Sequence, residues 1–188
     1  MPAQLILVMG VSGTGKSTIA KALAEQLNYI YIDADDFHSE QAKNMMADGK
    51  PINDEIRHAW ITRILLFLAD EHHNNARFVL AYSGLKKSQR QRFQQLETNL
   101  SGIFLQGEAA IIAQRLTART EHFFSTTLLD SQFYALELPA ENNTQKSDEN
   151  IILIDINQSI EDILSQATKF IHLQTGTIEN VSTMSATP

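Results

Sequence analysis

The residues from Gly10 to Ser17 read Gly-Val-Ser-Gly-Thr-Gly-Lys-Ser and match the phosphate-binding loop G-x-x-x-x-G-K-[ST]. Glycines let the backbone N–H groups of such a loop turn inward around a phosphate, and the following helix adds its positive dipole end. Lys16 can reach the β- and γ-phosphates, and the Ser17 hydroxyl can ligate Mg²⁺. The pattern predicts binding of a nucleoside triphosphate. The expected contacts are Gly10, Val11, Ser12, Gly13, Thr14, Gly15, Lys16, Ser17 and Thr18.

The segments on either side of this loop have the patterns that the motif requires. Leu5–Met9 is a continuous apolar run typical of a buried parallel strand, and Ser17–Leu27 carries apolar residues at helical spacing. The alternative is a glycine-rich turn that merely connects two core elements, but the pattern should arise by chance in only roughly one chain in a hundred of this length. The strand before and the helix after therefore favour nucleotide binding.

Three carboxylates follow the next apolar run, in the segment Asp33-Ala34-Asp35-Asp36. Phosphoryl transfer needs one carboxylate near Mg²⁺ and another that orients or deprotonates the attacking hydroxyl. We expect Asp33 on the metal side and Asp35 at the acceptor hydroxyl. Asp35 and Lys16 are both expected to be catalytic residues. Positions i and i+2 of an extended segment share a face, so both carboxylates are expected to face one cleft. The structural alternative is an aspartate that only caps the following turn.

Further apolar runs recur at intervals suited to strand–helix alternation, at Tyr29–Ile32, Phe78–Tyr82, Ile103–Leu105 and Ile151–Ile154. Helical patterns separate several of them, including Asp54–His73 and Glu108–Arg119. This alternation predicts an α/β fold, a three-layer α/β/α doubly wound five-stranded parallel sheet. Ligands of such sheets bind beyond the carboxyl ends of the strands, where Gly10, Asp33 and Ser83 are expected.

Composition bounds the class of protein. The 188 residues, 43% of them hydrophobic, suffice for one compact domain. A net charge of −7 disfavours nucleic acid as a partner. No apolar stretch approaches the roughly 20 residues of a membrane span, and the N-terminus lacks a signal-peptide layout. With no cysteine, disulfides and thiolate metal sites are excluded, and we expect a cytoplasmic protein without a membrane partner.

An acidic protein that handles phosphates must concentrate its cations locally. The candidates for a positively lined cleft are Lys16, Arg57, Lys86, Lys87, Arg90, Arg115 and Arg119. Residues 1–172 are expected to form the single domain. The polar segments Ala140–Asn150 and 173–188 are expected to be a loop and a flexible C-terminal tail.

Several blocks of sequence occur in the order found in gluconokinases. Besides the phosphate loop, they are Asp33–His38, Gly49–Asp54 with Arg57 and Trp60, Ser83–Lys87 with Arg90, and Arg119–Phe124 with Leu128-Leu129, Ser131–Phe133 and Leu136–Pro139. These later blocks are far more specific than the phosphate loop, which many unrelated nucleotide-binding proteins share. On these residues the chain resembles the gluconokinase family as far as about His172.

The resemblance implies phosphorylation of D-gluconate to 6-phosphogluconate with ATP and Mg²⁺, commonly by a homodimer. It also implies a P-loop kinase fold akin to shikimate and adenylate kinases. In that family the first carboxylate of the Asp-x-Asp pair lies near Mg²⁺ and the second meets the acceptor hydroxyl, which corresponds to Asp33 and Asp35. These are the roles argued above from the chemistry.

The resemblance also implies residues that hold the acceptor. Arg57, suited to bidentate binding of a carboxylate, and Lys86 would hold the sugar acid. Arg119 would act from a mobile lid, at about residues 119–139, and supply charge to the transferring phosphoryl group. The remaining family positions expected in the acceptor pocket are His38, His122 and Gln132.

Some positions depart from the family pattern, and several of them are near the acceptor side. They include Ala42, Met45, Ile56, Tyr82 and Gln89. A kinase for another small sugar acid or polyol is therefore one alternative. A nucleotide-binding regulatory protein without turnover is another, but such a protein would not need the acceptor-side carboxylate of Asp35.

Individual residues also have structural alternatives. Arg57 could pair with Asp54 or Glu55 on a helix surface, Trp60 could serve only in packing, and His122 could be a hydrogen-bonded structural histidine.

Overall fold

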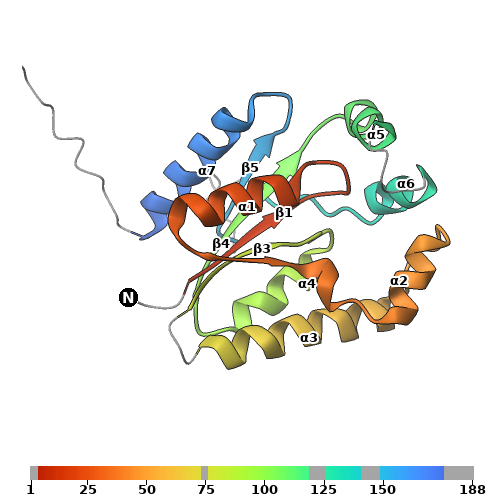
Figure 1. The fold of residues 1–188 in the computed structure, drawn as a ribbon, viewed down its shortest axis with the longest axis horizontal. Coiled ribbons are helices and arrows are strands. Elements are labelled where there is room, and N and C mark those ends of the chain that lie inside the picture. The colour runs from red at the N-terminus through yellow and green to blue at the C-terminus, as the bar shows by residue number, and fades with distance from the viewer. Residues whose placement is uncertain (1–3, 73–75, 119–125, 141–148, 176–188) are drawn as a thin grey trace, which may run out of the picture.

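The computed structural model describes residues 4–72, 76–118, 126–140 and 149–175. Five parallel strands form one sheet in the order β2-β3-β1-β4-β5, which confirms the predicted fold class (Figure 1). The strands are β1 (Gln4–Met9), β2 (Ile30–Asp33), β3 (Arg77–Ala81), β4 (Asn99–Gln106) and β5 (Ile151–Asp155). All five predicted strands are present, and β4 is longer than its apolar run indicated.

The connections between strands are helical. The α-helices are α1 (Lys16–Leu27), α2 (Glu40–Ala47), α3 (Asp54–His72), α4 (Lys87–Gln91), α5 (Ala109–Thr117), α6 (Thr126–Tyr134) and α7 (Ile160–Thr175). Two short 3₁₀ helices, η1 (Ala34–Phe37) and η2 (Arg92–Gln95), complete the described elements. The helix α7 extends past the domain end expected at residue 172, and residues 176–188 of the expected tail are outside the described residues.

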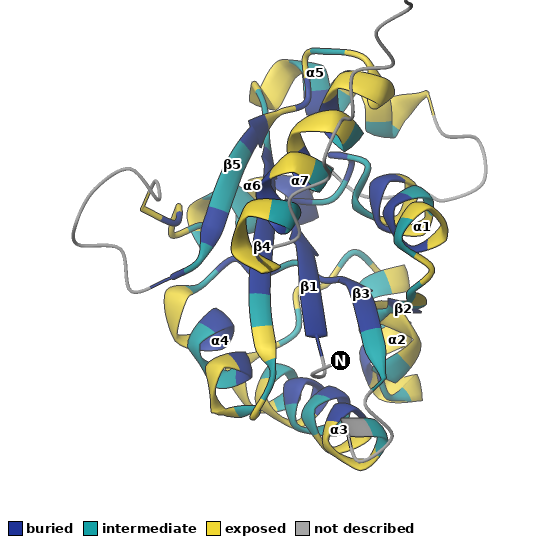
Figure 2. Cartoon of the chain, turned by 90° about the vertical axis from the view of Figure 1, so that its left-hand side faces the viewer, coloured by how far each residue is buried: buried dark blue, intermediate teal, exposed yellow. Residues whose placement is uncertain are grey.

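The sheet separates two apolar layers. Side chains alternate along β1, so that Ile6 and Val8 face one layer while Leu5 and Leu7 face the other. Helices α1 and α7 cover the first face, and α3 and α4 cover the second (Figure 1). Buried positions are concentrated in the strands and on the helix sides turned toward them (Figure 2). Two-sided burial explains why the strands are continuous apolar runs rather than alternating ones.

The carboxyl ends of the parallel strands meet where the phosphate loop, α2, α5 and α6 lie (Figure 1). The Gly10 N–H donates to the carbonyl of Ser83 at 3.2 Å, so the loop after β1 is tied to the loop after β3. Asp33 is the last residue of β2 and lies at the same edge. The three residues expected at this edge are therefore placed there.

The guanidinium of Arg90 joins three distant segments of the chain. It makes a bidentate ion pair with Glu149, at 2.8 and 3.0 Å, and both side chains are at most 5% exposed. Its Nη1 also donates to the carbonyls of Gly84, Leu85 and Glu137. This one cation therefore fixes the loop after β3, the chain that leaves α6 and the approach to β5.

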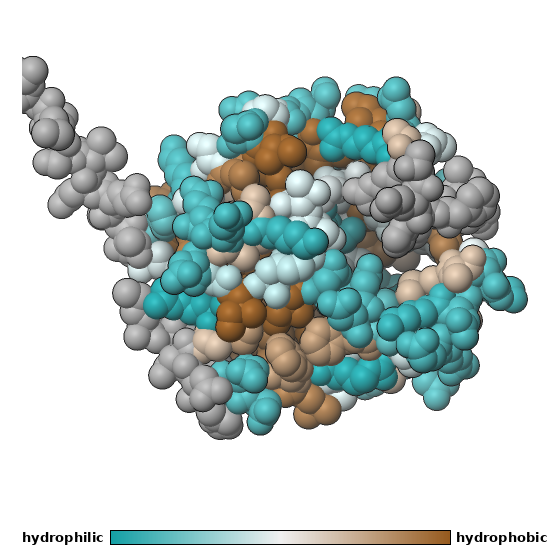
Figure 3. Space-filling view, viewed as in Figure 1, coloured by the Kyte–Doolittle hydropathy of each residue, from teal (hydrophilic) through white to brown (hydrophobic). Residues whose placement is uncertain are grey.

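Hydrophobic side chains are also found on the surface. Figure 3 shows such surface on the face of the molecule below α1. Exposed large hydrophobic residues include Ile30 on the edge strand β2, and Leu66 and Phe67 on α3. In the described part of the chain, no helix is long and apolar enough to cross a membrane.

The buried Arg90 pair makes a prediction about stability. Replacing Glu149 with Gln leaves a buried guanidinium without its counter-charge, so the free energy of unfolding should fall by about 3 kcal/mol. Glu40→Gln is the matched control, because Glu40 forms a pair with Lys43 at 3.2 Å while 85% exposed. That change should cost less than about 0.5 kcal/mol. Urea unfolding of both variants measures the difference, and equal losses would contradict the assigned importance of Arg90.

Candidate active site

The phosphate loop adopts a conformation that its glycines permit. Gly15 is the N-cap residue of α1 and has a φ of 91°, and Gly13 has a φ of 89°. A Cβ atom on Gly13 would lie 2.8 Å from the Cγ of Leu116 and 3.0 Å from a methyl carbon of Ile112. The loop therefore lies directly against α5 as well as opening α1.

Within the loop, two side chains converge on one carbonyl. The Thr14 hydroxyl donates to the Val11 carbonyl at 2.9 Å, and the Lys16 ammonium donates to the same oxygen at 3.0 Å. Thr14 and Val11 are buried, whereas Lys16 lines the cleft described below. The ammonium is thus held at the mouth of the loop, where a triphosphate would meet it.

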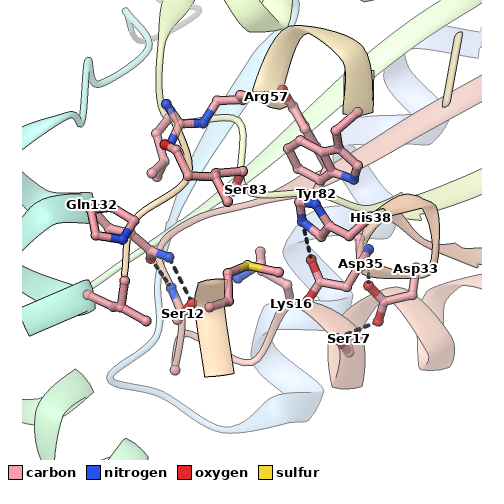
Figure 4. A pocket seen from close by; sticks show the side chains of 18 of the residues that line it. Ser12, Lys16, Ser17, Asp33, Asp35, His38, Arg57, Tyr82, Ser83 and Gln132 are labelled. Atoms are coloured by element: carbon pink, nitrogen blue, oxygen red, sulfur yellow. Dashed lines mark hydrogen bonds and ion pairs between the residues drawn. The ribbon is translucent and has the colours of Figure 1, made fainter. Parts of the chain in front are cut away.

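Asp33 is fixed by three donors. Its Oδ2 accepts from the Tyr31 hydroxyl at 2.7 Å. The same oxygen accepts from the Ser17 hydroxyl at 3.1 Å, and the Oδ1 of Asp33 accepts from the Asp35 N–H at 3.1 Å (Figure 4). Burial, followed by the hydrogen bond to Asp33, raises the pKa of Tyr31, so its hydroxyl stays a donor. The adjacent oxygens of Ser17 and Asp33 fit Mg²⁺, which prefers such hard ligands and a small number of protein contacts.

Asp35 reaches the same cleft by a route that differs from the prediction. It lies in the 3₁₀ helix η1, not in an extended segment, because the Asp33 carboxylate caps that turn. The predicted extended conformation is therefore wrong, although Asp33 and Asp35 do line one cleft. Desolvation by the surrounding walls, followed by repulsion from Asp33, raises the pKa of Asp35, while Lys16 opposes the shift. The Asp35 side chain is nevertheless 83% exposed to the open cleft, so water still reaches its carboxylate and the desolvation is only partial.

An aromatic wall stands beside Asp35. The His38 ring stacks on Trp60 with centroids 4.3 Å apart, and its Nε2 lies 3.7 Å from Asp35 Oδ1. The Trp60 Nε1–H donates to the Ala34 carbonyl at 2.6 Å, which locks the indole in place. Burial, followed by the charges of Arg63, Lys43 and Arg57, lowers the pKa of His38 to about 4. At neutral pH this wall therefore presents an uncharged imidazole.

The side chains of Arg57 and Lys86 meet at a shared carboxylate. Arg57 Nη1 and Lys86 Nζ each donate to Asp54 Oδ1 at 3.1 Å. Arg57 Nη2 also donates to the Ile52 carbonyl at 3.2 Å. Arg57 lines the cleft, whereas Lys86 and Asp54 do not. The predicted substrate residues are thus neighbours, and the ion pair with Asp54 that was considered as an alternative also exists.

Helix α6 contacts the phosphate loop through Gln132. The Ser12 N–H donates to Gln132 Oε1 at 2.7 Å, and Gln132 Nε2 donates to the Ser12 hydroxyl at 3.0 Å (Figure 4). Leu128 and Leu129 of α6 are 6% and 4% exposed. The described part of the expected lid therefore packs on the core through Leu128 and Leu129 and contacts the phosphate loop through Gln132.

These elements enclose a cleft of about 250 Å³. The phosphate loop and Lys16 form one side, Asp33, Asp35 and His38 another, and Arg57 lies on a different wall from Asp35 (Figure 4). A phosphate loop with its lysine, a carboxylate and an arginine thus share one cavity. Such a set of groups is suited to phosphoryl transfer, which depends on positioning and on charge.

Comparisons with known proteins show the family of the chain. The AAA domain family matches residues 5–139. A probable gluconokinase from Dictyostelium discoideum is 37% identical over 173 residues, covering 89% of this chain and 86% of the relative. The thermoresistant gluconokinase of Escherichia coli K12 is 33% identical over 167 residues, covering 89% and 93%. The chain belongs to the gluconokinase family.

Solved structures of related proteins have the same fold as this gluconokinase-family chain. A gluconokinase from Sinorhizobium meliloti 1021 superposes with a TM-score of 0.79 at 30% identity, over 93% of this chain and 95% of the other. A sugar kinase from Janibacter sp. HTCC2649 gives a TM-score of 0.81 at 30% identity, over 90% and 95%.

In this gluconokinase-family chain, most of the predicted site residues that are described line the cleft. They are Ser12, Gly13, Gly15, Lys16, Ser17, Asp33, Asp35, His38, Arg57 and Gln132. The other loop residues, Gly10, Val11 and Thr14, are buried, and Thr18 is exposed on α1. Lys86 lies outside the cleft lining because Asp54 holds its ammonium. Arg119 and His122 are outside the described residues.

Two residues that hold charged groups of the site in place, Tyr31 and Asp54, were not predicted to do so. Tyr31 was assigned only to a strand, and its i, i+2 relation to Asp33 is the signal that places both side chains on one face of β2. Asp54 was considered only as an ion-pair partner of Arg57, and its contact with Lys86 spans 32 residues of sequence. No local spacing rule would have found the second contact.

Asp35 provides a direct test of the acceptor side. Asp35→Asn keeps the size of the side chain but removes the carboxylate that is expected to take the hydroxyl proton, so kcat should fall roughly 10²–10⁴-fold while ATP binding is retained. Asp36→Asn is the matched control, because Asp36 is the exposed neighbour and does not line the cleft. Steady-state kinetics and ATP titration measure both effects. A loss of ATP affinity with kcat unchanged would assign Asp35 to the metal side instead.

His38 gives the folded protein a defined dependence on pH. Its pKa falls from the ordinary value of 6.5 to about 4, so the unfolded chain binds more protons between these values. The resulting stability is present in full above pH 6.5 and is lost as the pH drops toward 4. Urea unfolding across this range should show a shallower decline in the His38→Gln variant. Parallel declines in both proteins would contradict the lowered pKa.

Proposed function

We propose that this chain transfers the γ-phosphoryl group of ATP to the 6-hydroxyl of D-gluconate, forming 6-phospho-D-gluconate and ADP. The observation that carries the proposal is the convergence of Lys16, Asp35 and Arg57 on one cleft. Membership of the gluconokinase family supports the choice of ATP and gluconate.

In the proposed reaction, the chain acts mainly by positioning and by charge. The phosphate loop holds the triphosphate, and Lys16 offsets negative charge on the β- and γ-phosphates. Asp35 accepts the proton of the acceptor hydroxyl while the hydroxyl oxygen forms its bond to the γ-phosphorus. The bond between that phosphorus and the β–γ bridging oxygen breaks, and ADP leaves with the electron pair. These steps require no covalent intermediate between enzyme and phosphoryl group.

The metal side is proposed at Ser17 and Asp33, whose oxygens lie within 3.1 Å of each other. Mg²⁺ held there would neutralise charge on the β- and γ-phosphates. Because Tyr31 and the Asp35 N–H already orient the Asp33 carboxylate, this side chain would need little rearrangement on metal binding.

On the acceptor side, Arg57 is proposed to bind the carboxylate of gluconate while Asp35 meets its far hydroxyl. An open-chain sugar acid has these two groups at opposite ends, which suits residues on different walls (Figure 4). His38 and Gln132 also line the cleft and are proposed to contact the intervening hydroxyls.

The remaining family expectations stand as part of the same proposal. Arg119 and His122 are proposed to act on the transferring phosphoryl group and on the acceptor pocket, respectively. A homodimer, a cytoplasmic location and a place in the pentose phosphate pathway are likewise proposed on the family resemblance.

A second candidate is a kinase for a related sugar acid. Tyr82, where this sequence departs from the family pattern, lines the cleft and is 1% exposed. Its ring packs between Trp60 and Phe93, with centroids 5.3 and 5.1 Å away, so it fixes the shape of the inner wall. A different wall can favour an acceptor of different length or stereochemistry.

Acceptor discrimination tests the proposal. Gluconate should be phosphorylated with a kcat/KM roughly 100-fold above that of glucose, which lacks the carboxylate and leaves Arg57 without that partner. A coupled assay of ADP release measures kcat/KM for gluconate, glucose, shikimate and a panel of other aldonates. Equal values for gluconate and glucose would reject a carboxylate site. A different aldonate exceeding gluconate by orders of magnitude would select the second candidate.

A further inference from the structure

Asp54 is the shared partner of the two cations expected to hold the acceptor. Its Oδ1 accepts from Arg57 Nη1 at 3.1 Å and from Lys86 Nζ at 3.1 Å, and its Oδ2 accepts from Lys86 Nζ at 3.3 Å. Both donors therefore lie within about 6 Å of each other. The hydrogen bond from Lys86, then its charge, and more weakly Arg57, lower the pKa of Asp54, which is therefore a carboxylate at neutral pH.

The local sequence places this carboxylate beside Arg57. Asp54 is the first residue of α3, and the Asn53 side chain caps that helix by accepting from the Ile56 N–H at 2.8 Å. Residues i and i+3 of a helix are neighbours, so Arg57 lies one turn above Asp54. Lys86 reaches the same carboxylate from the N-cap of α4.

The hydrogen bonds of Arg57 use the two terminal nitrogens of its guanidinium. Nη1 donates to Asp54 and Nη2 to the Ile52 carbonyl, and Nε donates no hydrogen bond to the described residues. Arg57 lines the cleft and its side chain is 21% exposed, whereas Asp54 is 77% exposed and lies outside the lining. Asp54 thus grips the guanidinium from outside the cleft and leaves part of it available inside.

The charges of this cluster leave a net positive site. Two cations share one carboxylate, so a second carboxylate arriving from the cleft would complete the charge balance. Holding the guanidinium in place beforehand removes part of the entropy that its long side chain would otherwise lose when the acceptor binds. A free Arg57 would carry the same charge without that advantage.

We propose that Asp54 is a positioning residue that fixes Arg57 for an acceptor carboxylate and so favours sugar acids over neutral sugars. This inference rests on the proposed function for the identity of the acceptor. It adds that selectivity depends on a carboxylate which itself never touches the substrate.

The test compares Asp54→Ala with Glu55→Ala. Glu55 lies in the same first turn of α3 and is exposed, so each variant removes one negative charge from the same helix end. Titration calorimetry measures gluconate binding in the presence of a non-hydrolysable ATP analogue. Steady-state assays measure kcat and KM for gluconate, glucose and ATP, and thermal unfolding checks that both variants are folded.

Asp54→Ala should raise the Kd and KM for gluconate about three- to fivefold, the range that exposed ion pairs support. The kcat, the KM for ATP and the activity on glucose should stay within twofold of the parent, so the gluconate preference falls. Glu55→Ala should change none of these values. Asp54→Glu, which keeps a carboxylate, should restore most of the binding.

Other outcomes overturn the inference. A lower Kd for gluconate in Asp54→Ala would show that Asp54 competes with the substrate carboxylate. An equal change for gluconate and glucose, or in both Asp54→Ala and Glu55→Ala, would show a general effect on the helix. If the parent binds gluconate but does not phosphorylate it, the proposed function fails while the binding comparison still decides the role of Asp54. A parent that does not bind gluconate would overturn both.

Discussion

The ion pair between Arg90 and Glu149 is the constraint on which the two sides of the cleft depend. Arg90 binds the carbonyls of Gly84 and Leu85, and the Glu137 N–H donates to Leu85 at 2.8 Å. From there α6 leads back to the phosphate loop through Gln132, and the loop returns to Ser83 through Gly10. The phosphate loop, the loop after β3 and α6 are therefore connected to one another by hydrogen bonds, and the buried Arg90–Glu149 pair fixes two of these three segments.

These connections divide the site into parts that are fixed and side chains that can change partners. The phosphate loop, the loop after β3 and α6 are tied to one another and to the core. By contrast, Lys16 and Asp35 have side chains whose present partners, the Val11 carbonyl and His38, lie within the protein. Binding of the two substrates would exchange these partners, while Asp54 keeps Arg57 in place and the backbone of the site stays as it is.

The amino-acid sequence predicted the sheet and most of the cleft because both depend on local patterns. Buried parallel strands are apolar throughout, and the phosphate loop has a fixed spacing, so β1 and Gly10–Ser17 could be identified directly. The conformation of Asp35 could not, because a hydrogen bond from its own N–H to Asp33 converts an expected extension into a turn. Contacts such as Lys86 to Asp54 and Gln132 to Ser12 join segments 32 and 120 residues apart, and no periodicity encodes them.

Gly13 lies directly against α5, so a substitution of this loop residue would also affect the packing of that helix. The absent Cβ leaves room for Leu116 and Ile112, so this glycine serves the seating of a neighbouring helix in addition to shaping a phosphate cradle. A larger residue there would push on α5 before any nucleotide arrived. Substitution at this position is therefore limited by a packing contact within the chain. Redesign of the loop for a different phosphate donor would first need smaller side chains at Leu116 and Ile112 of α5.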